Sequence, residues 1–225
     1  MPKPVSCNDH FFDYIDSELK AYLLGFIFAD GCNYKELELD IELRKDDVEI
    51  LQLIKKALSV KTEIRERKTK NTKTLKVFSK YLGQRLSALG LTPRKTFTLC
   101  YPDIPKELNR HFIRGYLDGN GTVSNIETAE FHRRYVTIIG TPMICAKIAE
   151  IVLREAAVGM KYRICSGYND KNNKVAQVSV YGVRRTKLFL HYLCDNSNYS
   201  LSRKRTLINN IFNEVRVLKR TPQAA

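Results

Sequence analysis

Two polar residues, Asp30 and Asn120, occupy the same position in two similar stretches of the chain. Residues 22–31 are YLLGFIFADG and residues 112–121 are FIRGYLDGNG, so each polar residue follows a small residue and precedes a glycine. Carboxylates, and more weakly amides, offer the oxygen ligands that hard cations such as Mg²⁺ require. Whether the two side chains can act together depends on how these stretches pack.

The spacing of small residues predicts two helices that pack against each other. Gly25 and Ala29 are four residues apart, as are Gly115 and Gly119. Residues at this spacing share one face of a helix, and small side chains on that face let two backbones approach closely. The polar residues at the helix ends would then lie side by side.

These stretches resemble the paired motifs of the LAGLIDADG homing endonucleases. Residues 23–31 (LLGFIFADG) are similar to the first copy of the motif and residues 113–121 (IRGYLDGNG) to the second. One copy of such an apolar pattern is weak support, whereas two copies about one small domain apart in a basic chain are specific. The resemblance extends loosely over most of the chain. It implies a monomer of two pseudo-symmetric lobes, with saddle-shaped antiparallel sheets forming a DNA-binding face.

Composition also favours a nucleic-acid partner. The 225 residues carry a formal net charge of +14 and are 44% hydrophobic. Such an excess of positive charge favours nucleic acid or an acidic membrane surface. No apolar run approaches the roughly 20 residues that span a bilayer, and no signal-peptide segment opens the chain. We expect no membrane partner, reduced cysteines, and an intracellular location in bacterial or phage cytoplasm or an organelle.

Hydrophobic periodicity predicts an α+β fold of two αββαββα lobes joined through the motif helices. In the first half, after the motif helix, we expect strands at 35–44, 62–68 and 74–79 and helices at about 46–58 and 80–89. In the second half we expect strands at 132–139, 161–166 and 175–181 and helices at 143–154, 183–194 and 202–219. The lobes are assigned to residues 1–100 and 110–225, with a connector at 101–109. Gly31 and Gly121 are expected to end the motif helices in the left-handed conformation.

The polar faces of the two sheets supply candidate DNA-binding residues, because long polar side chains on a β-ribbon can reach base edges in the major groove. In the first lobe the candidates are Lys61, Glu63, Arg65, Arg67, Thr74, Lys76 and Phe78. In the second lobe they are Lys161, Arg163, Gln177, Ser179 and Tyr181. An acidic row accompanies the first set and either reads cytosines or faces solvent away from DNA: Glu36, Glu38, Asp40 and Glu42.

By resemblance, Asp30 and Asn120 form the cleavage centre and hold Mg²⁺, with the backbone carbonyls of Ala29 and Gly119 as further ligands. The family has an acid at both positions, so Asn120 departs from its pattern and should weaken metal binding. Three explanations are open: an engineered change, natural decay to a nicking or inactive enzyme, or ligation through the amide oxygen with reduced activity. Asp118 is no substitute, because it points about 200° away on the helix and is expected to cap between the helices.

Four basic residues are further catalytic candidates: Arg44, Lys45, Lys95 and Lys204. Such groups steady developing charge or position water, although each could equally contact a phosphate. The resulting function is a site-specific, Mg²⁺-dependent double-strand DNA homing endonuclease, with activity reduced or abolished by Asn120. The alternatives are a non-cleaving DNA-binding protein or an RNA maturase on the same scaffold, with host intron RNA as the partner. An unrelated RNA-binding protein is a third possibility.

Overall fold

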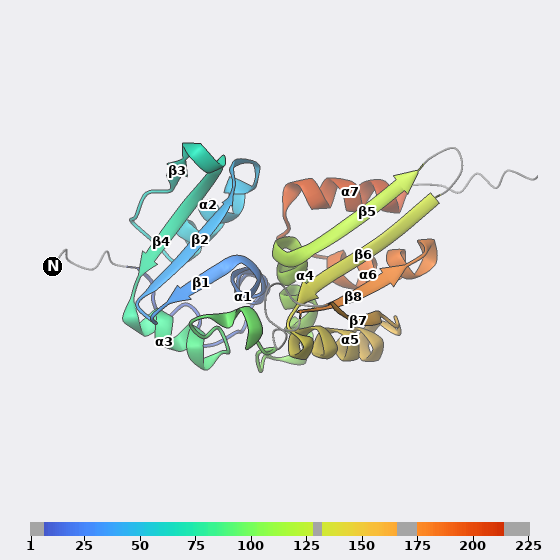
Figure 1. Ribbon diagram of the computed structural model, residues 1–225, viewed down its shortest axis with the longest axis horizontal. Helices are drawn as coiled ribbons and strands as arrows, with labels where there is room; N and C mark the ends of the chain where they lie inside the picture. Colours follow the sequence, from blue (N-terminus) through green and yellow to red (C-terminus); the bar gives the residue numbers. More distant parts are fainter. Residues whose placement is uncertain (1–6, 128–131, 166–174, 214–225) are drawn as a thin grey trace, which may run out of the picture.

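Two lobes lie side by side with the two motif helices between them (Figure 1). The computed structural model describes residues 7–127, 132–165 and 175–213. Each lobe contains one four-stranded antiparallel sheet, and the strand orders correspond. The first sheet has the order β1 (Gly31–Tyr34), β2 (Glu38–Arg44), β4 (Thr72–Phe78), β3 (Arg65–Arg67), and the second has the order β5 (Gly121–Glu127), β6 (His132–Gly140), β8 (Val175–Tyr181), β7 (Lys161–Cys165). The matching orders confirm the α+β class and the duplicated lobes.

The first lobe contains α1 (Glu18–Asp30), β1 (Gly31–Tyr34), β2 (Glu38–Arg44), α2 (Val48–Ala57), β3 (Arg65–Arg67), β4 (Thr72–Phe78) and α3 (Lys80–Ala88). The second contains α4 (Asn109–Asn120), β5 (Gly121–Glu127), β6 (His132–Gly140), α5 (Pro142–Ala156), β7 (Lys161–Cys165), β8 (Val175–Tyr181), α6 (Val183–Cys194) and α7 (Ser202–Asn213). Short 3₁₀ turns follow β2, β3 and α3 and precede α4.

The contact between α1 and α4 depends on glycine. A Cβ atom on Gly25 would lie 2.0 Å from the carbonyl oxygen of Phe112, and one on Gly115 would lie 2.0 Å from the carbonyl oxygen of Tyr22. Carbon and oxygen cannot approach so closely without a bond, so only glycine fits at either position. The two contacts mirror each other, as pseudo-twofold symmetry requires.

Gly31 and Gly121 do not adopt the left-handed conformation predicted for them. Their φ angles are −74° and −124°, and both residues are extended and begin a strand. The need for glycine is steric instead: a Cβ atom would lie 2.6 Å from the carbonyl oxygen of Ile27 or Leu117, respectively. Glycine therefore lets the chain turn directly from each motif helix into a sheet.

The strand prediction was wrong at the start of each sheet. The strands β1 and β5, which directly follow the motif helices, were not predicted. The strand predicted at 35–44 begins at Glu38, because Lys35 and Glu36 have positive φ angles of 53° and 59° and form the turn of the β1–β2 hairpin. Glu36 therefore does not belong to the acidic row of β2.

Other predicted boundaries are closer to the structure. Hydroxyl side chains of Ser17, Ser79 and Thr141 accept hydrogen bonds from backbone N–H groups and cap α1, α3 and α5, as serine and threonine do at helix starts. The strand predicted at 62–68 shortens to β3. The predicted extension of the last helix to residue 219 lies partly outside the described residues.

The segment that follows α6 joins the second lobe to the first. Glu18 at the start of α1 forms a 2.7 Å ion pair with the fully buried Arg114 of α4, and it also accepts a 2.7 Å hydrogen bond from the backbone N–H of Asn198. Ser202 at the start of α7 donates through its backbone N–H to Glu49 of α2 at 2.6 Å. Polar bonds therefore tie residues 198–202 to the first lobe.

None of the described helices combines the length and apolar character that a membrane crossing needs. All six cysteines are free thiols.

Candidate active site and nucleic-acid interface

Asp30 and Asn120 end the two motif helices next to each other. A Cβ atom added to Gly119 would lie 3.2 Å from Oδ2 of Asp30, and the side-chain amide of Asn120 donates a long 3.5 Å bond to the carbonyl oxygen of Ala29. Each side chain thus lies against the backbone of the opposite helix. Asp30 is half-buried and Asn120 is exposed.

The Asp30 carboxylate has no hydrogen-bond or ion-pair partner among the residues that the structure describes. Burial raises the pKa of this carboxyl group, and the nearby cations Lys95 and Lys204 partly oppose the rise. The oxygens of Asp30 are available to a ligand because no described residue bonds them, and the two lysines reduce the rise in pKa without reversing it.

Lys95 and Lys204 cap the ends of the two motif helices. The amine of Lys95 donates to three successive carbonyl oxygens of α1: Ile27 (3.3 Å), Phe28, and Ala29 (2.8 Å). The amine of Lys204, on α7, donates to carbonyl oxygens at the end of α4: Leu117 (2.6 Å), Asp118 (2.8 Å) and Gly121 (2.7 Å). The last carbonyls of a helix lack helical partners, and a cation there also complements the helix dipole.

Burial lowers the pKa of both lysines to about 8, and nearby carboxylates oppose the shift: Asp30 for Lys95, and Asp118 followed by Asp30 for Lys204. Both amines thus remain cationic at neutral pH. Sequence reasoning selected these lysines as catalytic candidates, but it could not show that both amines already bind backbone carbonyls. Their first physical role is to fix the helix ends that carry Asp30 and Asn120.

The donor set fits a hydrated hard cation better than an enclosed metal site. In the described ranges, no group of three or more His, Cys, Asp and Glu side chains could hold a metal ion. The carbonyl of Ala29 already accepts from Lys95 and Asn120, which leaves the carboxylate of Asp30, the amide of Asn120 and the carbonyl of Gly119 as the other oxygen donors of the predicted set. Mg²⁺ commonly keeps several waters and binds through one or two carboxylates together with substrate phosphates.

Asp118 lies away from this centre, in the direction that the helical offset predicts. It is only 3% exposed, and its Oδ2 atom accepts hydrogen bonds from the Tyr22 hydroxyl at 2.9 Å and from the backbone N–H of Leu201 at 2.8 Å. The side chain therefore bridges α4 to α1 and to the start of α7. Burial raises the pKa of Asp118.

Arg44 and Lys45 are not joined to Asp30 or Asn120 by any described bond. Arg44 forms a 3.3 Å ion pair with Asp46, and Lys45 pairs with Glu66. Arg44 therefore contacts an acidic side chain just after β2, and Lys45 contacts one on β3.

Sequence reasoning missed a different charged pair near the centre. Arg203 forms a 2.8 Å ion pair with the buried Asp47, and both side chains influence the pKa of Asp30: Asp47 raises it and Arg203 lowers it. The sequence feature that could have indicated Arg203 is its position directly before Lys204, which was already a catalytic candidate.

The acidic row of β2 lies on the same face as the DNA-binding candidates of β4. The sheet register places three pairs opposite each other: Glu38 and Phe78, Asp40 and Lys76, Glu42 and Thr74. The acidic row therefore shares one sheet face with these candidates and does not lie on the opposite face.

Neighbouring side chains neutralise the acidic row. Lys76 forms ion pairs with Glu38 and, at 3.3 Å, with Asp40. Arg67 pairs with Glu42 at 2.9 Å. The hydroxyls of Thr74 and Thr72 donate at 2.7 Å to Asp40 and Glu42, respectively. Because each carboxylate is paired, this face does not act as a bare acidic surface.

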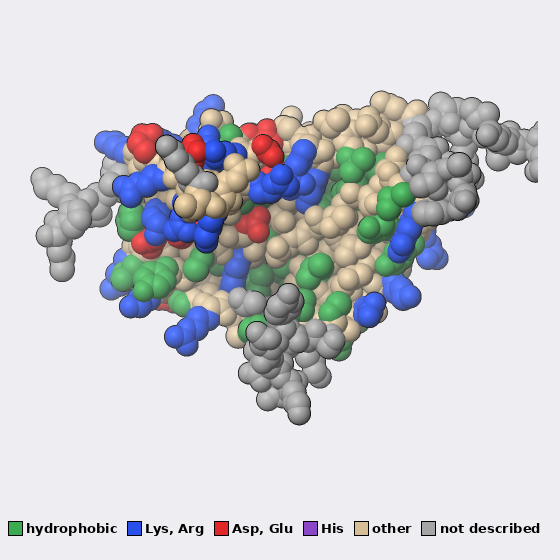
Figure 2. All heavy atoms as spheres, turned by 45° about the horizontal axis from the view of Figure 1, so that its top comes forward, with side chains coloured by type: hydrophobic (Ala, Val, Ile, Leu, Met, Phe, Trp, Pro, Cys, Tyr) green, Lys and Arg blue, Asp and Glu red, His purple; other side chains and the backbone are tan. Residues whose placement is uncertain are grey.

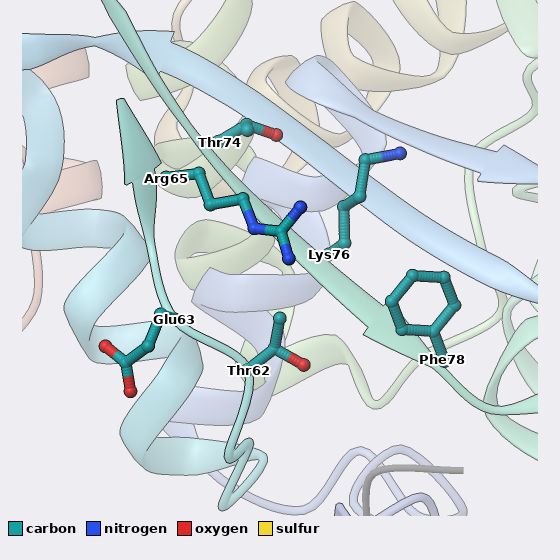
Figure 3. A pocket seen from close by; sticks show the side chains of 6 residues that line it. All are labelled: Thr62, Glu63, Arg65, Thr74, Lys76 and Phe78. Carbon is teal, nitrogen blue, oxygen red and sulfur yellow. The ribbon is translucent and has the colours of Figure 1, made fainter. Parts of the chain in front are cut away.

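Three first-lobe candidates differ in their surroundings. Glu63 forms a 2.9 Å ion pair with Lys55 of α2, and its carboxylate points away from the guanidinium of Arg65 (Figure 3). The exposed Lys61 precedes β3. Arg65 has no hydrogen bond or ion pair to any other described residue. It lines a shallow hollow on the sheet together with Thr62, Glu63, Thr74, Lys76 and Phe78.

The second lobe presents a different face at corresponding positions. Tyr181 lies opposite Tyr135, Ser179 opposite Thr137, and Gln177 opposite Ile139. On the edge strand β7, Lys161 lies opposite Ser179 and Arg163 opposite Gln177. No acidic residue occupies this set of paired positions. Figure 2 shows the contrast: acidic and basic side chains crowd together on the first lobe, whereas the second lobe shows separate Lys and Arg side chains and no acidic ones in this view.

No protein-family model matches the chain. The probable translation initiation factor IF-2 of Methanocaldococcus jannaschii is 24% identical over 217 residues, which cover 92% of this chain but only 17% of that protein. The chain therefore spans about a sixth of the length of this curated relative.

Solved structures are similar over most of the chain. The I-LtrWI LAGLIDADG homing endonuclease bound to target DNA has a TM-score of 0.58 and 13% identity, over 87% of this chain and 89% of that one. The I-GzeII LAGLIDADG homing endonuclease in complex with its DNA target has a TM-score of 0.54 and 14% identity, with coverages of 85% and 88%. The N-terminal LAGLIDADG domain of WhiA has a TM-score of 0.53 and 16% identity, with coverages of 83% and 89%. These comparisons confirm the LAGLIDADG fold.

Proposed function

We propose that this protein is a metal-dependent, site-specific endonuclease that acts on double-stranded DNA as a monomer. The supporting observation is the position of Asp30, whose free carboxylate lies beside Asn120 at the junction of two polar sheets. The net charge of +14 and the DNA-bound state of two similar structures fit a DNA partner. The initiation-factor match covers too little of that protein to carry its activity to this chain.

In this proposal, Asp30 and the amide of Asn120 hold Mg²⁺ together with a DNA phosphate. A bound Mg²⁺ ion supplies Lewis-acid polarisation of a phosphoryl oxygen and an activated water. Lys95 and Lys204 keep the helix ends, and hence both ligands, in fixed positions through their bonds to backbone carbonyls. Their positive charge also favours an approaching phosphate.

Asn120 makes the two halves of the centre unequal. An amide lacks the charge of a carboxylate, so metal affinity is lower on its side. We expect cleavage of both strands to be weak or absent, with nicking of one strand as the residual activity. Asn120→Asp should restore the second carboxylate at an exposed position, where the substitution adds no volume to the helix contact.

The decisive experiment uses a duplex selected for tight binding and placed in a supercoiled plasmid. Asn120→Asp should linearise this plasmid with Mg²⁺, whereas the unsubstituted chain should nick it slowly or leave it intact. Asp30→Asn should abolish cleavage in either background while binding persists, and a chelator should stop all cutting. Failure of Asn120→Asp to cut a duplex that it binds tightly would refute the nuclease.

A non-cleaving DNA-binding protein is the second candidate. It is favoured by Asn120 and by the lysine amines, which already bind backbone carbonyls. In that case Asn120→Asp would bind the same duplex with the same selectivity, and no metal ion would produce strand breaks.

A further inference from the structure

The sheet registers allow the two DNA-facing surfaces to be compared position by position. In the first lobe, Asp40 of β2 lies opposite Lys76 of β4. In the second lobe, Thr137 and Ser179 occupy the corresponding cross-strand position. The duplicated scaffold therefore presents an ion pair in one lobe and two hydroxyls in the other.

The first lobe presents a donor and an acceptor together. Lys76 lies 3.3 Å from Asp40 and also pairs with Glu38, while Thr74 donates to Asp40. In the major groove, a lysine is suited to the adjacent O6 and N7 acceptors of guanine, and a carboxylate accepts from the N4 amino group of cytosine. The pair therefore complements both bases of a C·G pair, whereas the methyl group of thymine would face two charged side chains.

The central hydroxyls of the second lobe satisfy each other. Thr137 and Ser179 are buried and share a 2.9 Å hydrogen bond. The neighbouring pair differs in character: Ile139 is 45% exposed and lies opposite Gln177, the amide of which donates to Ser179 at 3.0 Å. An exposed isoleucine on a polar sheet face has little reason to face water, which makes it suited to an apolar ligand group.

Ile139 and Gln177 together match the other kind of base pair. A glutamine amide can bond adenine through N6 and N7, and an apolar side chain can contact the methyl group of thymine. Arg163 lies beside Gln177, as Arg65 lies beside Thr74 in the first lobe. These arginines occupy equivalent positions, so they do not distinguish the two halves.

We propose that the protein recognises an asymmetric duplex, with a C·G pair contacted by Asp40 and Lys76 and an A·T pair contacted by Ile139 and Gln177. This inference rests on the proposed DNA-binding function and adds the base preference of each half-site. A good bidentate contact discriminates against a wrong base by about 1–3 kcal/mol, so each preference should be roughly 5- to 160-fold.

The test is selection of duplexes by the full chain from a random library in the presence of a chelator. The selected base frequencies are then checked by competition binding with single base-pair changes. The informative variant is Asp40→Thr with Lys76→Ser, which transfers the chemistry of the second lobe and removes one charge of each sign. Its net charge and overall salt dependence should therefore stay unchanged. The matched control is Ile139→Ser with Gln177→Ala.

The first variant should lose the C·G preference at one position and keep the A·T preference in the other half-site, and the control should do the reverse. Circular dichroism would verify that both variants are folded. Equal base composition in the two half-sites, or a C·G preference that survives in the first variant, would overturn the inference while DNA binding stands. Failure to enrich any duplex would instead refute the proposed function itself.

Discussion

Replacing Gly25 by alanine tests the close contact of α1 and α4. The new Cβ atom would lie 2.0 Å from the carbonyl oxygen of Phe112, and the next two nearest atoms are also backbone atoms, at 2.9 and 3.0 Å. Non-bonded heavy atoms settle at about 3.5 Å, so the helices must separate by roughly 1.5 Å. No flexible side chain can move aside to relieve the clash. We expect a loss of at least about 1–3 kcal/mol in the free energy of unfolding, the usual cost of overpacking.

Urea unfolding followed by circular dichroism measures this loss. Gly159→Ala is the matched control, because a Cβ atom there meets no other atom within 4 Å. The equivalent Gly115→Ala should cost a similar amount, since its Cβ atom would lie 2.0 Å from the carbonyl oxygen of Tyr22. The double variant should lose less than the sum, because both substitutions separate the same helices. If Gly25→Ala is as stable as Gly159→Ala, the steric argument for the helix pair is wrong.

Three further outcomes follow from the charged groups. Lys95 and Lys204 have pKa values of about 8 in the folded chain against an ordinary 10.5, so the unfolded chain binds more protons between these values. The free energy of unfolding should therefore rise as pH increases through that window, and urea titrations at several pH values should show a smaller rise for Lys204→Met. Tyr22→Phe removes the 2.9 Å hydrogen bond to the buried Asp118 and should cost about 1.5–3 kcal/mol in urea unfolding; no loss would contradict the bridging role. Lys161→Ala should weaken binding to all duplexes alike and reduce the slope of log K against log salt by about 1 if it contacts a phosphate; an unchanged slope would exclude that contact.

The helix pair could be predicted because its determinants are local. The four-residue spacing of small residues specifies a shared helix face, and two copies of the pattern specify a partner. The prediction failed at the glycine that follows each motif helix. Gly31 and Gly121 were expected to adopt positive φ angles, but the constraint on them comes from the preceding carbonyls of Ile27 and Leu117. The presence of glycine in a sequence does not show whether the position needs a positive φ angle or lacks space for a Cβ atom.

The polar alternation of residues 35–44 correctly predicted which face of the strand is buried, but it wrongly predicted where the strand begins. It correctly separates the buried from the outward side chains of β2, yet it continues through Lys35 and Glu36, which form a turn. Period-two alternation cannot show where a hairpin reverses, and the four-residue strand β1 is too short to show a period.

The surroundings of the candidate site depend on contacts between distant segments. Lys204 reaches carbonyls that precede it by more than 80 residues, and the Arg203–Asp47 ion pair joins the last helix to the first lobe. No local pattern encodes such distances. The sequence therefore predicted that Asp30 and Asn120 lie close together, but not the network that surrounds them.

The bonds from Glu18 and Glu49 to residues 198–202 affect how the halves of this protein could be exchanged. Although the two lobes have the same strand order, residues 198–202 of the second lobe complete the polar bonding of the first. In a chimera joined at the connector, Glu18 and Glu49 would come from one parent and residues 198–202, which donate hydrogen bonds to them, from the other. A recombined protein should therefore keep residues 195–205 with the N-terminal half that they contact, even when every other part of the second copy comes from a different parent.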